Sequence, residues 1–70
     1  MTLKELRLRN KLTQKELSEK LGLHQSTIGK YELGLAIPPI KQLKKISEVF
    51  HLKPKQEEEL LNSFLEIKGG

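Results

Sequence analysis

The chain of 70 residues carries a formal net charge of +4 and contains no cysteine. This length suffices for one small domain with one modest core, and the absence of thiols excludes disulfides and thiolate metal sites. We therefore expect a protein of a reducing cytoplasm, since no apolar run reaches the length of a membrane span and the first residues lack a signal peptide's apolar core.

The positive charge is concentrated in the first two thirds of the chain. Residues 1–45 hold ten Lys and Arg against four Glu, whereas residues 46–70 hold three Lys against five Glu. A basic segment of this kind is typical either of solvated helix faces or of a surface that meets phosphates. Charge alone does not decide between these two interpretations, so the sequence motifs are needed to decide.

Two capping boxes predict where the first two helices begin. Thr2 is followed three residues later by Glu5, and Thr13 by Glu16. At this spacing each side chain satisfies a backbone amide at the start of a helix. The second helix is expected to end at Gly22, because glycine adopts the left-handed backbone conformation that turns a chain sharply.

A third and a fourth helix follow. The third is predicted over about residues 25–33, with Ile28 and Tyr31 facing inward and Gly34 ending it. The fourth begins after the two prolines at 38–39, because proline is excluded from a helix beyond its first turn. Its predicted apolar stripe consists of Ile40, Leu43, Ile46, Val49 and Phe50.

A fifth helix is predicted from Pro54 to about residue 67. Proline fits a first helical position, and the glutamates at 57–59 suit the positive end of the helix dipole. Its apolar stripe consists of Leu60, Leu61, Phe64, Leu65 and Ile67. No strand pattern competes, because β-branched residues are few and do not alternate with polar ones. The chain is therefore predicted to be all-α, with a single domain over residues 1–70.

The second and third helices, joined by the turn at Gly22, have the form of a helix-turn-helix, whose second helix enters the major groove of DNA. The chain resembles the phage repressor and Cro type of helix-turn-helix, also called the xenobiotic-response-element family. The resemblance lies in the run LTQKELSEKLGLHQSTIGKYELG, in the ELR before it and in the IPPIKQLKKISEVFHL after it, and covers about residues 3–52.

This resemblance implies a compact five-helix, lambda-repressor-like domain with its core in residues 2–52. Such a domain binds double-stranded DNA at specific sequences and regulates transcription in the cytoplasm of a bacterium, an archaeon or a phage-infected host. We expect repression rather than activation, because the sequence shows no separate activating or ligand-binding domain.

The resemblance implies base contacts along the third helix. Gln25, Ser26 and Lys30 match its exposed face; glutamine suits adenine, lysine suits guanine, and serine suits a base or a phosphate. His24 stands where the family has a serine or threonine cap, so it either contacts the backbone or a base, or leaves a weaker helix start. Gly29 either lets the helix approach the sugar-phosphate backbone closely, or it has no function and is only tolerated in the helix.

The resemblance also implies phosphate contacts. Gln14 matches the glutamine that opens the second helix and whose amide approaches a phosphate. Thr27 either touches a phosphate or bonds back within its own helical turn, and Lys41 occupies a position that often meets phosphate. Lys11 replaces a turn glycine and lies near the DNA backbone. Either Asn10 or Lys11 must supply that turn, and asparagine tolerates the positive φ better.

Other matching positions are structural. Arg7 and Glu32 correspond to a pair that joins the first helix to the end of the third, the alternative being two independent solvated charges. Leu33 replaces an asparagine that contacts phosphate in many members. The apolar loop Leu35–Ile37 meets thymine methyls, a second subunit or the core, and the sequence does not choose among these. The other residues with a predicted structural role are Thr13, Glu16, Gly22, Ile28 and Gly34.

Family members generally act as two-fold dimers on palindromic DNA sites. We expect a homodimer through the fifth helix, although the same apolar stripe is also explained if this helix only closes the core. The residues expected in the contact are Leu60, Leu61, Phe64 and Leu65. No cofactor, metal, membrane contact or small-molecule effector is expected.

Two other functions are alternatives to DNA binding. One is a protein-interaction role, such as an antitoxin-type partner that uses the apolar loop or the fifth helix. The other is a small enzyme, which we do not expect. The chain has no cysteine, no aspartate, no clustered histidines and no phosphate-cradling glycine loop, so the groups for metal or acid–base chemistry are hard to assemble.

Overall fold

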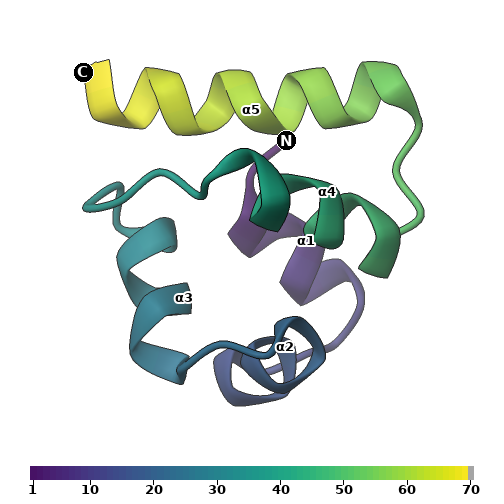
Figure 1. Cartoon of the computed structure of the whole chain (residues 1–70), viewed down its shortest axis with the longest axis vertical. Helices are drawn as coiled ribbons and strands as arrows, with labels where there is room; N and C mark the ends of the chain where they lie inside the picture. Colours follow the sequence, from purple (N-terminus) through teal and green to yellow (C-terminus); the bar gives the residue numbers. More distant parts are fainter. Residues whose placement is uncertain (70) are drawn as a thin grey trace.

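Four short helices surround an apolar core, and a longer fifth helix lies across them (Figure 1). The computed structural model describes the backbone of residues 1–69 and the side chains of residues 1–66. The helices are α1 (Leu3–Arg9), α2 (Gln14–Leu21), α3 (Gln25–Glu32), α4 (Ile40–Val49) and α5 (Pro54–Gly69). No strand occurs among the described residues, which confirms the all-α prediction.

Both predicted capping boxes are present. The backbone N–H of Glu5 donates to Thr2 Oγ1 at 3.1 Å, and that of Thr2 donates to Glu5 Oε1 at 3.0 Å. Thr13 and Glu16 exchange the same two bonds at 3.0 and 2.9 Å. Each box satisfies amides that the first turn leaves without a helical partner, so α1 and α2 begin where local sequence dictates.

The first four helices all end in the same way. After each helix, one residue takes a positive φ: 56° at Lys11, 69° at Gly22, 75° at Gly34 and 53° at His51. The residue after it then donates its N–H to a carbonyl five positions earlier, as Leu23 does to Ser18 at 2.9 Å. This bond closes the end of the helix and reverses the chain. Glycine is present at two of the four turns, as predicted.

The turn after α1 corrects the prediction that favoured asparagine. Lys11 takes the left-handed conformation, whereas Asn10 has a φ of −92°. The side chain of Asn10 is engaged differently: its Nδ2 donates to the carbonyl of Leu6 at 2.8 Å. The Leu6 carbonyl also accepts from the backbone N–H of Asn10 at 3.2 Å, so Asn10 is tied to the last turn of α1 and the positive φ falls on Lys11.

The core draws on all five helices. Leu17, Ile28, Ile46 and Leu60, from four of them, have no exposed surface. The ring of Phe64 in α5 meets that of Tyr31 in α3 edge-on, with centroids 6.3 Å apart and planes at 71°. The ten core residues are Leu3, Leu6, Leu17, Leu21, Ile28, Tyr31, Leu43, Ile46, Leu60 and Phe64.

Two predicted apolar stripes are only partly buried. Leu60 and Phe64 belong to the core of the chain itself, so they are not available for the dimer contact expected of them. On the same helix Leu61 is half-buried and Leu65 is 50% exposed, while the side chain of Ile67 lies outside the described residues. In α4, Ile40 is 65% exposed instead of facing the core. On both helices, therefore, the apolar stripe extends beyond the part that packs against the core, and the rest of the stripe is exposed.

Candidate nucleic-acid interface

One face of α3 is buried and the other is open. Ile28 and Tyr31 anchor the inner face in the core. Ser26 and Lys30, four residues apart, lie on the outer face and are exposed, as is Gln25 at the start of the helix. The structure thus presents three of the predicted base-reading residues together on one short, well-anchored helix.

The amino terminus of α3 lacks a side-chain cap. His24 occupies the N-cap position in an extended conformation, and its exposed imidazole makes no capping hydrogen bond. Its carbonyl accepts from the N–H of Thr27 at 3.0 Å, so the backbone alone closes this first turn. The start of α3 therefore lacks the side-chain cap that a serine or threonine would give, and the ring of His24 is exposed at the end of the open face.

Three side chains from three helices form a hydrogen-bonded cluster beneath this face. Arg7 in α1 donates from Nε to Glu32 Oε2 at 2.7 Å and from Nη2 to Glu32 Oε1 at 3.1 Å. Its Nη1 also donates to the carbonyl of Leu12 at 3.0 Å. Gln14 in α2 donates from Nε2 to the same Glu32 Oε1 at 3.0 Å. The predicted Arg7–Glu32 pair is therefore present, with an additional partner.

The cluster is nearly shielded from water. The side chains of Arg7 and Glu32 are 10% and 5% exposed. Burial by itself raises the pKa of Glu32, but hydrogen bonds from Arg7 and Gln14 outweigh it and hold that pKa below its ordinary value. The hydrogen bond to Glu32 in turn raises the pKa of Arg7. Removing one member of such a buried pair costs about 3–5 kcal/mol, so the pair fixes α3 against α1.

Gly29 is not required by packing within the chain. A Cβ built at this position would meet only Gln14 Nε2, at 4.0 Å, which is ordinary van der Waals contact. The glycine therefore leaves open space on the outer side of α3, beside the amide of Gln14. A larger side chain would fill space that the fold itself leaves empty.

The side chains of the other predicted phosphate residues make no hydrogen bond to this cluster. Thr27 is half-buried in the first turn of α3. Lys11 is exposed at the turn between α1 and α2, and Lys41 is exposed in the first turn of α4. Among the described side chains no ion pair holds Lys11, Lys30 or Lys41, so their ammonium groups remain open to solvent.

The structure reveals two features that the sequence did not indicate. The bond from Gln14 to Glu32 joins residues 18 positions apart, for which no local pattern exists. Lys45 brings its Nζ to 3.6 Å from a Cβ built at Gly22. Its cation thus lies beside the negative end of the α2 dipole.

The loop after α3 exposes apolar side chains. Leu33 and Leu35 are 72% and 66% exposed, and Ile37 is also exposed, whereas Ala36 packs against the core. Burial in the core is thereby excluded for Leu35 and Ile37, and contact with DNA or with another protein remains. Within the described part of the chain, no cluster of His, Asp and Glu suits a metal, and no helix is long and apolar enough to cross a membrane.

Comparisons with known proteins agree with this geometry. The chain matches the helix-turn-helix family over residues 3–56, from α1 to the first turn of α5. It is 32% identical to an uncharacterized HTH-type transcriptional regulator, YobD, of Bacillus subtilis (strain 168), over 91% of this chain and 68% of the relative. No solved structure matches it significantly. With α2, the Gly22 turn and the exposed face of α3 inside the matched region, the chain belongs to the Cro/C1-type helix-turn-helix family of DNA-binding transcriptional regulators.

Proposed function

We propose that this protein binds double-stranded DNA at specific sequences, inserts α3 into the major groove and represses transcription. The observation that carries the proposal is the exposed polar face of α3, held at a fixed angle by the Arg7–Glu32–Gln14 cluster. A reading helix must be rigid, because misplacing a bidentate hydrogen bond loses the discrimination it provides.

Base recognition is assigned to the outer face of α3. The amide of Gln25 suits the N6 and N7 atoms of adenine, and the ammonium of Lys30 suits O6 and N7 of guanine. Ser26 and His24, both exposed at the amino end of the helix, contact neighbouring bases or the adjoining phosphate. Recognition helices of this type place their first residues closest to the base edges.

Phosphate binding is assigned to groups around α3. The second amide hydrogen of Gln14 is free once Glu32 has taken the first, and the amino terminus of α2 adds free backbone N–H groups at the same place. Thr27, Lys11 and Lys41 supply further contacts. The open space at Gly29 admits the sugar-phosphate wall next to Gln14.

Two copies of the chain acting on a palindromic operator would double the small number of base contacts that one α3 provides. Selection of bound sites from random double-stranded DNA tests this proposal. We expect an inverted repeat with half-sites about 10 base pairs apart, one turn of the duplex. A Gln25→Ala, Lys30→Ala double variant should lose the preference while a Lys55→Ala control keeps it.

A role confined to binding another protein predicts a different result. The exposed Leu33 and Leu35 would then serve that partner, and the selection would return no enriched sequence. Purified wild-type chain that shifts random and selected DNA equally would overturn specific recognition.

A further inference from the structure

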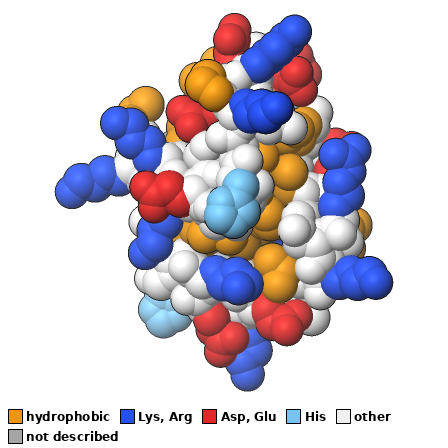
Figure 2. All heavy atoms as spheres, turned by 90° about the vertical axis from the view of Figure 1, so that its right-hand side faces the viewer, with side chains coloured by type: hydrophobic (Ala, Val, Ile, Leu, Met, Phe, Trp, Pro, Cys, Tyr) orange, Lys and Arg blue, Asp and Glu red, His pale blue; other side chains and the backbone are white. Residues whose placement is uncertain are grey.

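A groove of about 260 Å³ lies between α4 and α5. On the face that carries the connection between these two helices, hydrophobic side chains gather at the centre and charged side chains surround them (Figure 2). The groove is lined by one face of each helix, at the spacing of three and four residues that brings side chains together. Its apolar lining residues are Ile40, Leu43, Pro54 and Leu61. Because only packing brings the two helix faces together, local sequence patterns do not indicate this site.

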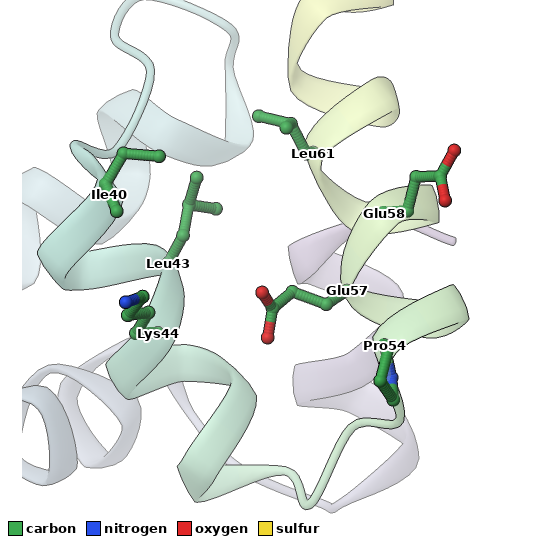
Figure 3. A pocket seen from close by; sticks show the side chains of 7 residues that line it. All are labelled: Ile40, Leu43, Lys44, Pro54, Glu57, Glu58 and Leu61. Atoms are coloured by element: carbon green, nitrogen blue, oxygen red, sulfur yellow. The ribbon is translucent and has the colours of Figure 1, made fainter.

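The two walls of the groove carry opposite charges. Lys44 belongs to the α4 wall; Glu57 points from α5 toward α4, whereas Glu58 points away from it (Figure 3). Lys44 is exposed and Glu57 is half-buried. Among the described side chains, no ion pair holds either group. The groove therefore offers a ligand one cation and one anion on the two sides of an apolar centre.

We propose that this groove binds a small apolar zwitterion, namely an apolar amino acid or a dipeptide. The carboxylate of the ligand meets the ammonium of Lys44, and its own ammonium meets the carboxylate of Glu57. Its apolar side chain packs between Leu43, which is only 5% exposed, and the half-buried Leu61. Burial of that side chain supplies affinity, and the two charged contacts orient the ligand.

The charges of the groove distinguish a zwitterion from other small molecules. A fatty acid brings only negative charge, which Glu57 and Glu58 repel, and a polyamine brings only positive charge, which Lys44 repels. An uncharged apolar molecule would take water from both charged groups without replacing their hydrogen bonds. A molecule that carries both charges satisfies both walls.

The size of the groove favours a small molecule over a macromolecule. A stable protein interface uses about 20–30 residues on each side, whereas seven residues line this groove. Its volume of about 260 Å³ lies just below the range of about 300–1,000 Å³ that is typical of pockets for drug-sized ligands. The groove also uses no residue of α3, so this inference goes beyond the proposed DNA binding and does not depend on it.

Titration of the isotope-labelled chain with the dipeptide leucyl-leucine, followed by two-dimensional NMR, tests the inference. We expect saturable shifts of the backbone amide signals of the groove residues in α4 and α5, with the signals of α3 unchanged. The N-acetylated dipeptide lacks the ammonium, and the dipeptide amide lacks the carboxylate. Each should bind roughly fivefold more weakly than leucyl-leucine, because each loses one exposed ion pair.

Two conservative variants test which side chain meets which charge. Glu57→Gln should bind leucyl-leucine roughly fivefold more weakly but bind the N-acetylated form as the wild type does. Lys44→Gln should show the same loss for leucyl-leucine and no loss for the amide. Lys55→Gln and Glu59→Gln change exposed charges on α5 outside the groove, so they should leave all three affinities unchanged.

Three results would contradict the inference. Equal affinity for the three peptides would show that the charged walls do not contact the ligand. Groove signals that shift on dilution of the protein, but not on addition of peptide, would place a second copy of the chain there instead. The absence of saturable shifts would leave the groove without this ligand class. Failure to select a DNA sequence, by contrast, would overturn the proposed function alone.

Discussion

The side-chain amide of Gln14 donates from Nε2 to Oε1 of Glu32 at 3.0 Å, joining the first residue of α2 to the last of α3. A carboxylate only accepts hydrogen bonds, so Glu32 selects the rotamer in which the nitrogen, and not the oxygen, faces the cluster. One amide hydrogen is used, and the other remains for a ligand. Glu32 therefore acts as a positioning residue for the proposed phosphate contact.

A double-mutant cycle tests this positioning role. Gln14→Ala and Glu32→Gln should each weaken DNA binding, but Glu32→Gln should add little once Gln14 is absent. We expect a coupling of about 1 kcal/mol between the two positions, measured by fluorescence anisotropy at a temperature where all four proteins are folded. Strictly additive losses would mean that Glu32 acts on the fold and not on Gln14.

The pKa of Glu32 predicts how stability depends on pH. In the folded protein this pKa lies below its ordinary value of 4.5. Between the lowered pKa and the ordinary value, the unfolded chain therefore binds more protons than the folded protein does. The contribution of Glu32 is complete above about pH 4.5 and is lost as pH falls through the lowered pKa. The unfolding free energies of wild type and Glu32→Gln, from urea titrations, should differ by a constant above pH 4.5 and converge below it.

The capping glutamates act in the same direction. Hydrogen bonds from Thr2 lower the pKa of Glu5, and those from Thr13 lower the pKa of Glu16. Both are present in wild type and in Glu32→Gln, so the difference between the two proteins isolates Glu32. A gap that persists unchanged at low pH would show that the carboxylate charge does not stabilise the pair.

Gly29→Ala should move stability and DNA affinity in opposite directions. Alanine gains about 1 kcal/mol over glycine inside a helix, and the new Cβ meets only Gln14 Nε2 at 4.0 Å. The same Cβ would obstruct the proposed approach of the sugar-phosphate wall. The midpoint temperature of thermal unfolding should therefore rise while the affinity for the operator falls. An unchanged affinity would show that Gly29 has no function in DNA binding and is only tolerated in the helix.

Base and phosphate contacts should respond differently to truncation. Gln25→Ala and Lys30→Ala should each cost about 1–3 kcal/mol and relax the preference at one operator position. Lys41→Ala should weaken binding to all sequences alike and reduce the slope of affinity against salt by about one unit. Lys53→Ala, an exposed lysine between α4 and α5, is the control. An unchanged slope in Lys41→Ala would remove it from the phosphate contacts.

Lys11→Gly should stabilise the domain. Lys11 has a φ of 56°, a conformation that costs an L-residue about 1–2 kcal/mol and glycine almost nothing. After the greater entropy of glycine in the unfolded chain is subtracted, we expect a gain of about 0.5–1 kcal/mol in urea unfolding. Gly22→Ala is the converse variant, since its φ is 69° and space for the Cβ exists. It should be destabilised.

Helix positions could be predicted from the sequence because their signals act within four or five residues. The pairs Thr2–Glu5 and Thr13–Glu16 and the glycines at 22 and 34 mark starts and ends that the structure reproduces. The pairing of Arg7 with Glu32 was also predicted, but through family resemblance, since 25 positions separate the two residues.

Tertiary structure alone decided how each apolar stripe is used. A stripe shows which side of a helix is apolar, but burial depends on which neighbours cover it: Leu60 and Phe64 enter the core, whereas Ile40 and Leu65 remain exposed. Likewise, only the structure shows that Lys11 takes the positive φ, while the backbone and the side chain of Asn10 are both bonded to the carbonyl of Leu6. Local patterns therefore determined where the helices lie in the chain. Their packing determined which side chains are left to bind DNA or a second copy.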